Sequence, residues 1–353
     1  MKASPLYHLL WVFFLAACSG QPQKENAPYL SCNGRTMGTT YTVKYADAAA
    51  RDFQTAIDSL LEEINLEVST YIEASTISRL NQADSLFLPG YDPHTGQWTT
   101  YANTHFWINY EKAKEVFERS GGSFDPTVMP IVNYWGFGYT EKKPVEKIDS
   151  LKIDSLMDFI GLDQVVSTDG KQIKKRYPGV QLDFSALAKG YGVDAVGLLL
   201  ESKGVSDYLV EIGGELRAKG KNAEGAWWNV GINTPQEDAS TTAVQMAFPL
   251  QNQSIATSGN YRNFYEVKGQ KFSHTINPKT GFPERSTLLS ASVFAPDCMS
   301  ADAYATAFMV MGKDKALPLA EELPGIEAYF IYSDDAGNMR TAYTSGLKDY
   351  FEK

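Results

Sequence analysis

Apolar and polar residues alternate along the chain in patterns that predict interleaved strands and helices. Residues 39–46 alternate and are rich in β-branched and aromatic side chains, which predicts a strand. Apolar residues at helical spacing from Phe53 to Val68 predict a helix, and a second helix is expected at 101–119, before Gly121-Gly122. The same patterns predict helices at 186–200 and 300–311, and strands at 180–183, 208–212, 228–232, 243–250, 289–295 and 328–332.

This order of elements bears on the fold class and the domain organisation. The strands and helices follow no regular βαβ rhythm, which favours an α+β fold over a doubly wound parallel sheet. We find no linker in residues 33–353 and expect them to form one compact mixed catalytic unit. The charged residues 141–158 are interpreted as a surface excursion.

The N-terminal residues resemble an export signal. Lys2 precedes an apolar run at 9–17, which is too short to cross a bilayer as a mature helix but suits a secretory signal peptide at 1–17. Small residues stand directly before Cys18, as in a bacterial lipobox, so we expect Cys18 to be lipidated. The alternative is an ordinary signal peptide with a chance cysteine. Residues 18–32 are then expected to form a tether between membrane and domain.

Composition and charge exclude some classes of function. The 353 residues are 43% apolar and 21% charged, as in a globular protein, and the formal net charge is −10. This balance argues against nucleic acid as the partner, because phosphate backbones require clustered Lys and Arg. A small anionic ligand held by one cation, a metal ion and backbone amides remains compatible. Whether Cys32 and Cys298 pair is left open by the sequence.

Two clusters suggest chemistry from spacing alone. Asp183 stands at a strand-to-helix junction and Lys189 lies almost two turns into the helix, an arrangement suited to cradling a phosphate. Asp302 and Thr306 are four residues apart on a predicted helix and share one face. A carboxylate and a hydroxyl are oxygen ligands suited to Mg²⁺. For each cluster the alternative is an ordinary solvated or half-buried helix face.

His274 lies in a polar loop rich in Gly and Pro. An ordinary histidine pKa near 6.5 would suit a general base there. A purely structural role for this side chain is the alternative.

Taken together and in order, the polar clusters resemble the FAD:protein FMN transferase (ApbE) family. The resemblance spans roughly residues 33–345 and rests on nine motifs: MGTTY at 37, STY with SRLN at 69–81, GGSFDPTV at 121, WGFG at 135, LDFSALAKGYGVD at 182, EIGGEL at 211, ATSGNY at 256, HTINPKTG at 274 and SADAYATAF at 300. Asn277 and Lys279 depart from the Asp and Arg of many relatives but stay polar, so altered local contacts are expected rather than lost activity.

The resemblance implies a T-fold-like catalytic unit and a set of site residues. It implies that Mg²⁺ is held by Asp302, Thr306 and the backbone carbonyl of Ala186, and that His274 deprotonates an acceptor hydroxyl. It also implies that FAD is lined by eight residues: Met37, Tyr71, Ser123, Phe124, Asp125, Asp183, Lys189 and Ile276.

The implied reaction transfers FMN from FAD to a Ser or Thr hydroxyl of another protein and releases AMP. The implied acceptors are flavin subunits of membrane redox complexes, which fits an exported lipoprotein facing the periplasm or cell exterior. Two alternatives stay open: a Mg²⁺-dependent FAD pyrophosphatase, and a flavin-binding lipoprotein without catalysis. A penicillin-binding enzyme, suggested by Lys279-Thr280-Gly281, is excluded because no Ser-x-x-Lys precedes this box.

Overall fold

The computed structural model describes residues 27–87, 91–92, 97–98, 104–140, 145, 148–168, 172–233, 244–260, 264–267, 270–273, 275–284 and 286–351. Within these residues, none of the helices has both the length and the apolar character needed to cross a membrane. The predicted signal peptide at 1–17, Cys18 and His274 lie outside the described residues.

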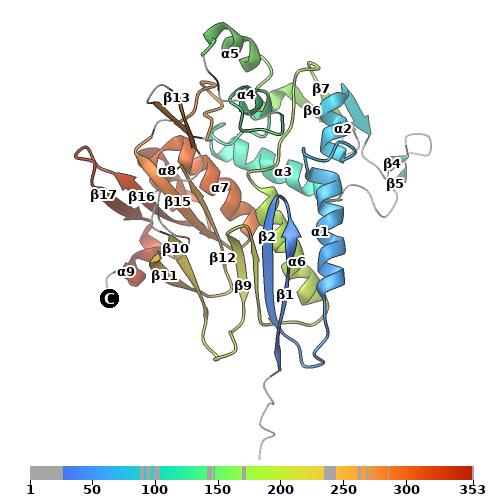
Figure 1. Ribbon diagram of the computed structural model, residues 1–353, viewed down its shortest axis with the longest axis vertical. Helices are drawn as coiled ribbons and strands as arrows, with labels where there is room; N and C mark the ends of the chain where they lie inside the picture. Colours follow the sequence, from blue (N-terminus) through green and yellow to red (C-terminus); the bar gives the residue numbers. More distant parts are fainter. Residues whose placement is uncertain are drawn as a thin grey trace, which may run out of the picture.

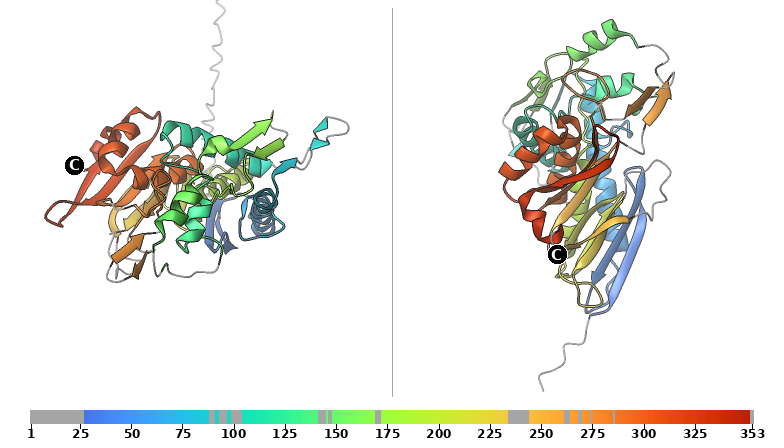
Figure 2. Two further views of the ribbon diagram at one scale, coloured as in Figure 1. Left: turned by 90° about the horizontal axis from the view of Figure 1, so that it is seen from above. Right: turned by 90° about the vertical axis from the view of Figure 1, so that its left-hand side faces the viewer.

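An antiparallel sheet forms the centre of the fold, with eight strands in the order β1-β2-β8-β9-β12-β15-β16-β17 among the described residues. Its strands are β1 (Tyr29–Thr36), β2 (Thr39–Ala46), β8 (Tyr208–Ile212), β9 (Glu215–Lys219), β12 (Ser254–Gly259), β15 (Leu288–Ala295), β16 (Glu327–Ser333) and β17 (Met339–Tyr343). Figures 1 and 2 show the first strands in blue and the last strands in red at opposite ends of the sheet. The strands predicted at 39–46 and 208–212 are confirmed with the same bounds.

The N-terminal edge of the sheet corrects the expected start of the domain. β1 begins at Tyr29, and its residues pair with β2 from Tyr29 opposite Ala46 onward. Residues 29–32, which we assigned to the tether, therefore belong to the folded unit. Cys32 is buried in this strand and Cys298 is buried elsewhere in the core, and both are free thiols. The two cysteines do not form the disulfide that the sequence left open.

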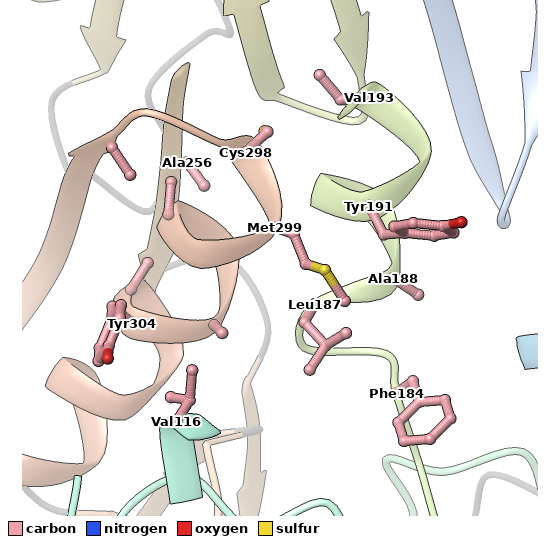
Figure 3. Close-up of a cluster of buried hydrophobic side chains, with 14 of the residues drawn as sticks. Val116, Phe184, Leu187, Ala188, Tyr191, Val193, Ala256, Cys298, Met299 and Tyr304 are labelled. Carbon is pink, nitrogen blue, oxygen red and sulfur yellow. The ribbon is translucent and has the colours of Figure 1, made fainter. Parts of the chain in front are cut away.

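Helices cover one face of this sheet. They include α1 (Gln54–Val68), α3 (Thr104–Arg119), α6 (Ala188–Ser202), α7 (Cys298–Met311) and α8 (Lys313–Glu322). α7 packs on β12 and β15 and against α6, which in turn packs on β8. Figure 3 shows α6 and α7 side by side, with Met299 of α7 beside Leu187 at the start of α6. Nearly every residue of α7 is buried, as expected for a helix that is apolar on all sides and lies inside the protein.

The opposite face of β12, β15 and β16 is covered by a separate hairpin of β10 (Trp228–Asn233) and β11 (Val244–Leu250). The Phe248 ring packs at 5.1 Å from that of Phe294 and at 6.0 Å from that of Tyr329. Both faces of these central strands are therefore buried. This explains why β15 and β16 consist of nearly continuous runs of small and apolar residues.

The remaining elements are short and lie mainly at the end of the molecule that carries α4 and α5 (Figure 1). They are α2 (Thr76–Gln82), β3 (Ser85–Phe87), β4 (Tyr91–Asp92), β5 (Gln97–Trp98), α4 (Met129–Tyr134), α5 (Ser150–Met157), the 3-10 turns Leu162–Gln164 and Ser345–Leu347, β6 (Val165–Thr168), β7 (Gln172–Lys175), β13 (Phe264–Val267), β14 (Gln270–Ser273) and α9 (Lys348–Phe351).

One prediction about a single segment is wrong: residues 180–183 form no strand, and only Gln181 makes an isolated bridge, to Val128. The described part of residues 141–158 is mostly exposed, as expected for a surface segment, but it contains the helix α5, which the sequence did not predict and which is capped by Asp149 and anchored by the buried Ile153. Residues 257–259, quoted above within the ATSGNY motif, belong to strand β12, which the sequence did not predict and whose first three residues are buried.

Candidate active site

A cleft of about 940 Å³ opens where the N-terminus of α6, the middle of α7 and the β8–β9 turn meet. This volume is at the upper end of the range for pockets that bind cofactors. Its lining includes Gly213, Gly214 and Glu215 from the β8–β9 turn, Thr257, Ser258 and Gly259 from β12, and Val128, Val132, Trp135 and Phe137 from the α4 region.

The structure brings together seven of the site residues expected from the sequence. All seven line the one cleft, although they come from distant parts of the chain: Tyr71, Asp183, Ala186, Lys189, Ile276, Asp302 and Thr306. His274 itself is outside the described residues, but the two residues that follow it, Thr275 and Ile276, line the cleft.

The four other expected FAD contacts are not among the residues that line the cleft. Phe124 is buried in the main core, and Ser123 beside it is also buried. Asp125 accepts hydrogen bonds from the N–H and the hydroxyl of Thr127, at 2.8 and 2.6 Å. Met37 lies at the β1–β2 turn with a φ of 49° and packs against the core. Direct FAD contact by these four residues stays a prediction.

The segment around Asp125 is nevertheless hydrogen-bonded to a residue that lines the cleft. The Asp183 N–H donates to the Pro126 carbonyl at 2.7 Å. The Asp183 carboxylate in turn accepts from the Ser185 N–H at 3.0 Å and from its hydroxyl at 2.7 Å. These bonds fix the turn that leads into α6, and burial raises the pKa of Asp183 although the Ser185 hydrogen bonds oppose the shift.

Three charged groups lie together in the cleft. Lys189 Nζ donates to Glu215 Oε1 at 3.0 Å and lies 3.9 Å from Asp302 Oδ2. Burial alone would lower the Lys189 pKa, but the carboxylates of Asp302 and Glu215 outweigh it and raise the pKa. The lysine is therefore a fixed positive charge, positioned to meet an anionic group.

Glu215 carries an unsatisfied oxygen. The residue is 5% exposed, and its Oε2 is buried without a hydrogen-bond partner in the protein. Burial raises the Glu215 pKa, and Lys189 opposes that shift. A buried carboxylate oxygen without a partner is costly, so this atom is suited to a ligand hydroxyl, a water molecule or a cation.

The Asp302 carboxylate binds the start of α6. Gly190 is the third residue of this helix, so its N–H has no acceptor within the helix. It donates to Asp302 Oδ2 at 3.0 Å. Ala186 lies two residues before α6, so its carbonyl accepts no hydrogen bond from the helical backbone and is available to a ligand.

These atoms fit the magnesium site that the resemblance implied. Asp302 is 3% exposed, Thr306 follows it by one helical turn, and both line the cleft with Ala186. Among the described residues no group of three or more His, Cys, Asp or Glu is suited to hold a metal. A cation here would instead depend on one carboxylate, one hydroxyl and one carbonyl, an oxygen set suited to Mg²⁺ with water and phosphate as further ligands.

The α4 side of the cleft is apolar and aromatic. Trp135 is fully buried, and its Nε1–H donates to the Gly281 carbonyl at 2.7 Å, which joins α4 to the loop that carries Ile276. Tyr71 is 67% exposed and packs edge-on against Tyr139. The cleft thus has a charged side suited to phosphates and an apolar side suited to a flat ring system.

Sequence reasoning missed Glu215, although it quoted the EIGGEL motif around it. The Gly213-Gly214 pair between two strands predicts a tight turn, and both glycines have positive φ, 64° and 108°. Nothing in the local sequence connects Glu215 with Lys189, which lies 26 residues earlier. The polar residues of β12, quoted within the ATSGNY motif, were given no role.

Comparisons with known proteins agree with this geometry. The family model described as the ApbE family matches residues 37–330. The FAD:protein FMN transferase of Haemophilus influenzae is 38% identical over 337 residues, which cover 92% of this chain and 90% of the relative. The FAD:protein FMN transferase of Vibrio cholerae serotype O1 is 36% identical and is matched over 99% of both chains.

Solved structures give the same result. The flavin transferase ApbE from Vibrio cholerae has a TM-score of 0.78 at 34% identity, over 92% of this chain and 99% of that one. The apo form of the Pseudomonas stutzeri flavinyl transferase ApbE has a TM-score of 0.80 at 30% identity, over 93% and 98%. The expected α+β fold class is confirmed. With sequence and fold both matched over nearly the whole folded unit, the chain belongs to the ApbE family.

Proposed function

We propose that this protein is an FAD:protein FMN transferase, which moves FMN from FAD to a Ser or Thr hydroxyl of an acceptor protein and releases AMP. The activity named for its relatives supports this assignment. The observation that carries it is the cleft lined by Lys189, Asp302, Thr306 and Ala186 beside an apolar wall. A dinucleotide with a flat ring and a diphosphate matches these two sides.

The residues of this chain then have distinct tasks. Lys189 binds the diphosphate, and its charge is retained because two carboxylates raise its pKa. Asp302, Thr306 and the Ala186 carbonyl would hold Mg²⁺, which neutralises negative charge on the diphosphate and so favours attack at phosphorus. Tyr71 and the α4 residues orient the flavin ring.

The chemical step is a substitution at the phosphorus on the FMN side. His274 takes the proton of the acceptor hydroxyl, whose oxygen forms a new bond to phosphorus. The bond from this phosphorus to the bridging oxygen breaks, and AMP leaves with that oxygen. The product is an acceptor protein that carries FMN through a phosphoester.

The N-terminal sequence supports a location outside the cytoplasm. An apolar run at 9–17 followed by Cys18 suits a lipoprotein signal, and residues 18–28 would tether the folded unit to a membrane. We propose that the enzyme is exported, anchored through a lipid on Cys18, and acts on flavin subunits of membrane redox complexes. Metabolic labelling with a clickable fatty acid, compared with Cys18→Ala, tests the anchor.

Reconstitution tests the activity. The purified chain is incubated with FAD, Mg²⁺ and a candidate acceptor subunit, and the acceptor is analysed by intact mass spectrometry. We expect a gain of one FMN that requires Mg²⁺, disappears with EDTA and is absent when the acceptor hydroxyl residue is replaced by Ala. Free FMN and AMP with unmodified acceptor would identify a pyrophosphatase instead. Binding of FAD without turnover would identify a flavin-binding protein.

A further inference from the structure

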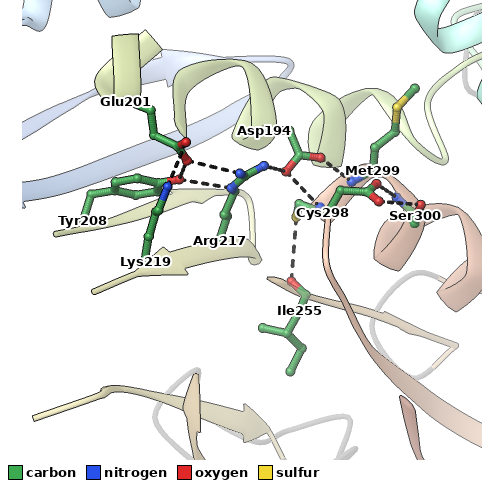
Figure 4. Close-up of polar contacts among 10 residues, drawn as sticks. Asp194, Glu201, Tyr208, Arg217, Lys219, Ile255, Cys298, Met299 and Ser300 are labelled. Carbon is green, nitrogen blue, oxygen red and sulfur yellow. Dashed lines mark hydrogen bonds and ion pairs between the residues drawn. The ribbon is translucent and has the colours of Figure 1, made fainter. Parts of the chain in front are cut away.

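A buried carboxylate connects α6 to the beginning of α7. Asp194 lies on α6 and is 7% exposed. Its Oδ1 accepts from the Cys298 N–H at 3.0 Å, and its Oδ2 accepts from the Met299 N–H at 2.9 Å. These are the first two N–H groups of α7, which no residue within the helix can satisfy. Figure 4 shows Asp194 between this helix start and Arg217.

Asp194 is itself held on its other side. Arg217 Nη1 donates to Asp194 Oδ1 at 2.7 Å, while its Nε donates to the Tyr208 hydroxyl at 3.1 Å and its Nη2 to Glu201 at 3.3 Å. Lys219 completes the network through Glu201 at 2.9 Å (Figure 4). The carboxylate therefore has little freedom to move and is suited to hold α7 in one place.

Two hydrogen bonds join α6 and α7 in opposite directions. A side chain of α6 reaches the backbone of α7 where Asp194 accepts from the Cys298 N–H, and a side chain of α7 reaches the backbone of α6 where Asp302 accepts from the Gly190 N–H. Two of the three proposed magnesium ligands, Asp302 and Thr306, come from α7, and the third, Ala186, lies just before α6. All three line the cleft.

Close packing holds the two helices together at the same place. A Cβ atom at Gly190 would lie 2.4 Å from the Cys298 carbonyl oxygen and 2.8 Å from the Met299 Cα, so only glycine allows this approach. The two hydrogen bonds and this close packing thus set how far the Ala186 carbonyl lies from Asp302 and Thr306.

We propose that Asp194 is a positioning residue for the divalent cation, which sets the separation of the Ala186 carbonyl from Asp302 and Thr306 by fixing α7 against α6. This role rests on the proposed Mg²⁺-dependent function. Asp194 lines no part of the cleft, so it acts only through the helices it joins.

A matched pair of variants tests the proposal. Asp194→Asn places an amide against an N–H group and Arg217, and so breaks the link between the helices. Asp297→Asn removes the same charge from the same helix end, because Asp297 is the N-cap of α7 and accepts from the Ser300 N–H at 2.7 Å. Among the described residues Asp297 forms no hydrogen bond or ion pair with α6, and Asn is an equally good N-cap.

The first measurement is the Mg²⁺ concentration that half-saturates FMN transfer. The second is the Mg²⁺-dependent rise in melting temperature of the FAD-bound protein, which requires no turnover. For Asp194→Asn we expect the half-saturating Mg²⁺ concentration to rise by about 10- to 100-fold, as when residues behind metal ligands are changed. The melting temperature should then respond only at correspondingly higher Mg²⁺. For Asp297→Asn we expect both Mg²⁺ dependences to match the wild type.

Equal Mg²⁺ dependence in Asp194→Asn and wild type, or equal shifts in both variants, would overturn the proposal. If Asp194→Asn does not fold, Asp194→Glu keeps the charge but moves the carboxylate by one methylene, and it should show the same weakened Mg²⁺ response. A wild-type protein that ignores Mg²⁺ altogether would refute the proposed function itself, which is a different result from an unshifted variant.

Discussion

Replacing Gly190 with Ala should separate the two helices that carry the cleft residues. The added Cβ would lie 2.4 Å from the Cys298 carbonyl oxygen, whereas ordinary contacts begin at 3.4 Å. The atoms it meets are backbone, so no side chain can rotate away. The two helices must therefore move apart by about 1 Å. This would also lengthen the hydrogen bond from the Gly190 N–H to Asp302 Oδ2.

The effect on stability should be modest and the effect on activity large. Overpacking of this kind costs about 1–3 kcal/mol, and the better helix propensity of Ala returns about 1 kcal/mol of that. A misplacement of about 1 Å in a catalytic site lowers the rate by about 100-fold. We therefore expect a folded protein with a slightly lower melting temperature, and FMN transfer reduced by about two orders of magnitude.

The assay compares Gly190→Ala with Gly192→Ala under saturating FAD and Mg²⁺. A Cβ at Gly192 would meet only the ends of flexible side chains, Met37 Cε at 3.1 Å and Ile212 Cδ1 at 3.2 Å. Gly192→Ala should therefore keep most of its activity while gaining the same helix propensity. Full activity and unchanged Mg²⁺ dependence in Gly190→Ala would refute the idea that the α6–α7 spacing controls the site.

Two further predictions concern buried carboxylates. Glu215→Gln keeps an oxygen that accepts from Lys189 but removes one negative charge from the cleft, so metal-free FAD should bind more tightly by about 1 kcal/mol. Flavin fluorescence titration measures the affinity for FAD. Weaker FAD binding by Glu215→Gln would show instead that Lys189 requires the negative charge of Glu215. Asp125 has a pKa raised by burial to about 6, above the value of about 3.9 in an unfolded chain. Its contribution to stability is complete below pH 4 and is lost as the pH rises through 6. The free energy of unfolding, measured in urea, should therefore fall less between pH 4 and pH 7 in Asp125→Asn than in the wild type, by up to about 3 kcal/mol. An unchanged pH profile would contradict the raised pKa of Asp125.

Much of the fold could be predicted where local patterns and burial agree. The alternation at 39–46 predicted strand β2 with the observed bounds, because one face of β2 is buried and the other is partly exposed. The pattern was not sufficient for β12, where Ser254 and Ala256 are buried but small or polar. It was also not sufficient for α5, which buries only Ile153.

The site could be predicted only in part, for a physical reason. Asp302 and Thr306 share a helix face, so spacing alone brings them together. Asp194 and Cys298 are joined across 104 residues, and no local pattern records such a contact. Motif resemblance supplied Ala186, whereas the hydrogen bond from the Gly190 N–H to Asp302, which joins α6 to α7, is visible only in the structure.

The central claim is that the Ala186 carbonyl, Asp302 and Thr306 bind one divalent cation beside the diphosphate of FAD. A crystal structure of the protein with FAD and Mn²⁺ in place of Mg²⁺, with anomalous scattering used to locate the metal, tests it most directly. The account predicts an anomalous peak about 2.0–2.3 Å from an oxygen of each of the three residues and in contact with a phosphate oxygen. A metal bound elsewhere, or FAD bound with its diphosphate away from Lys189, would contradict it.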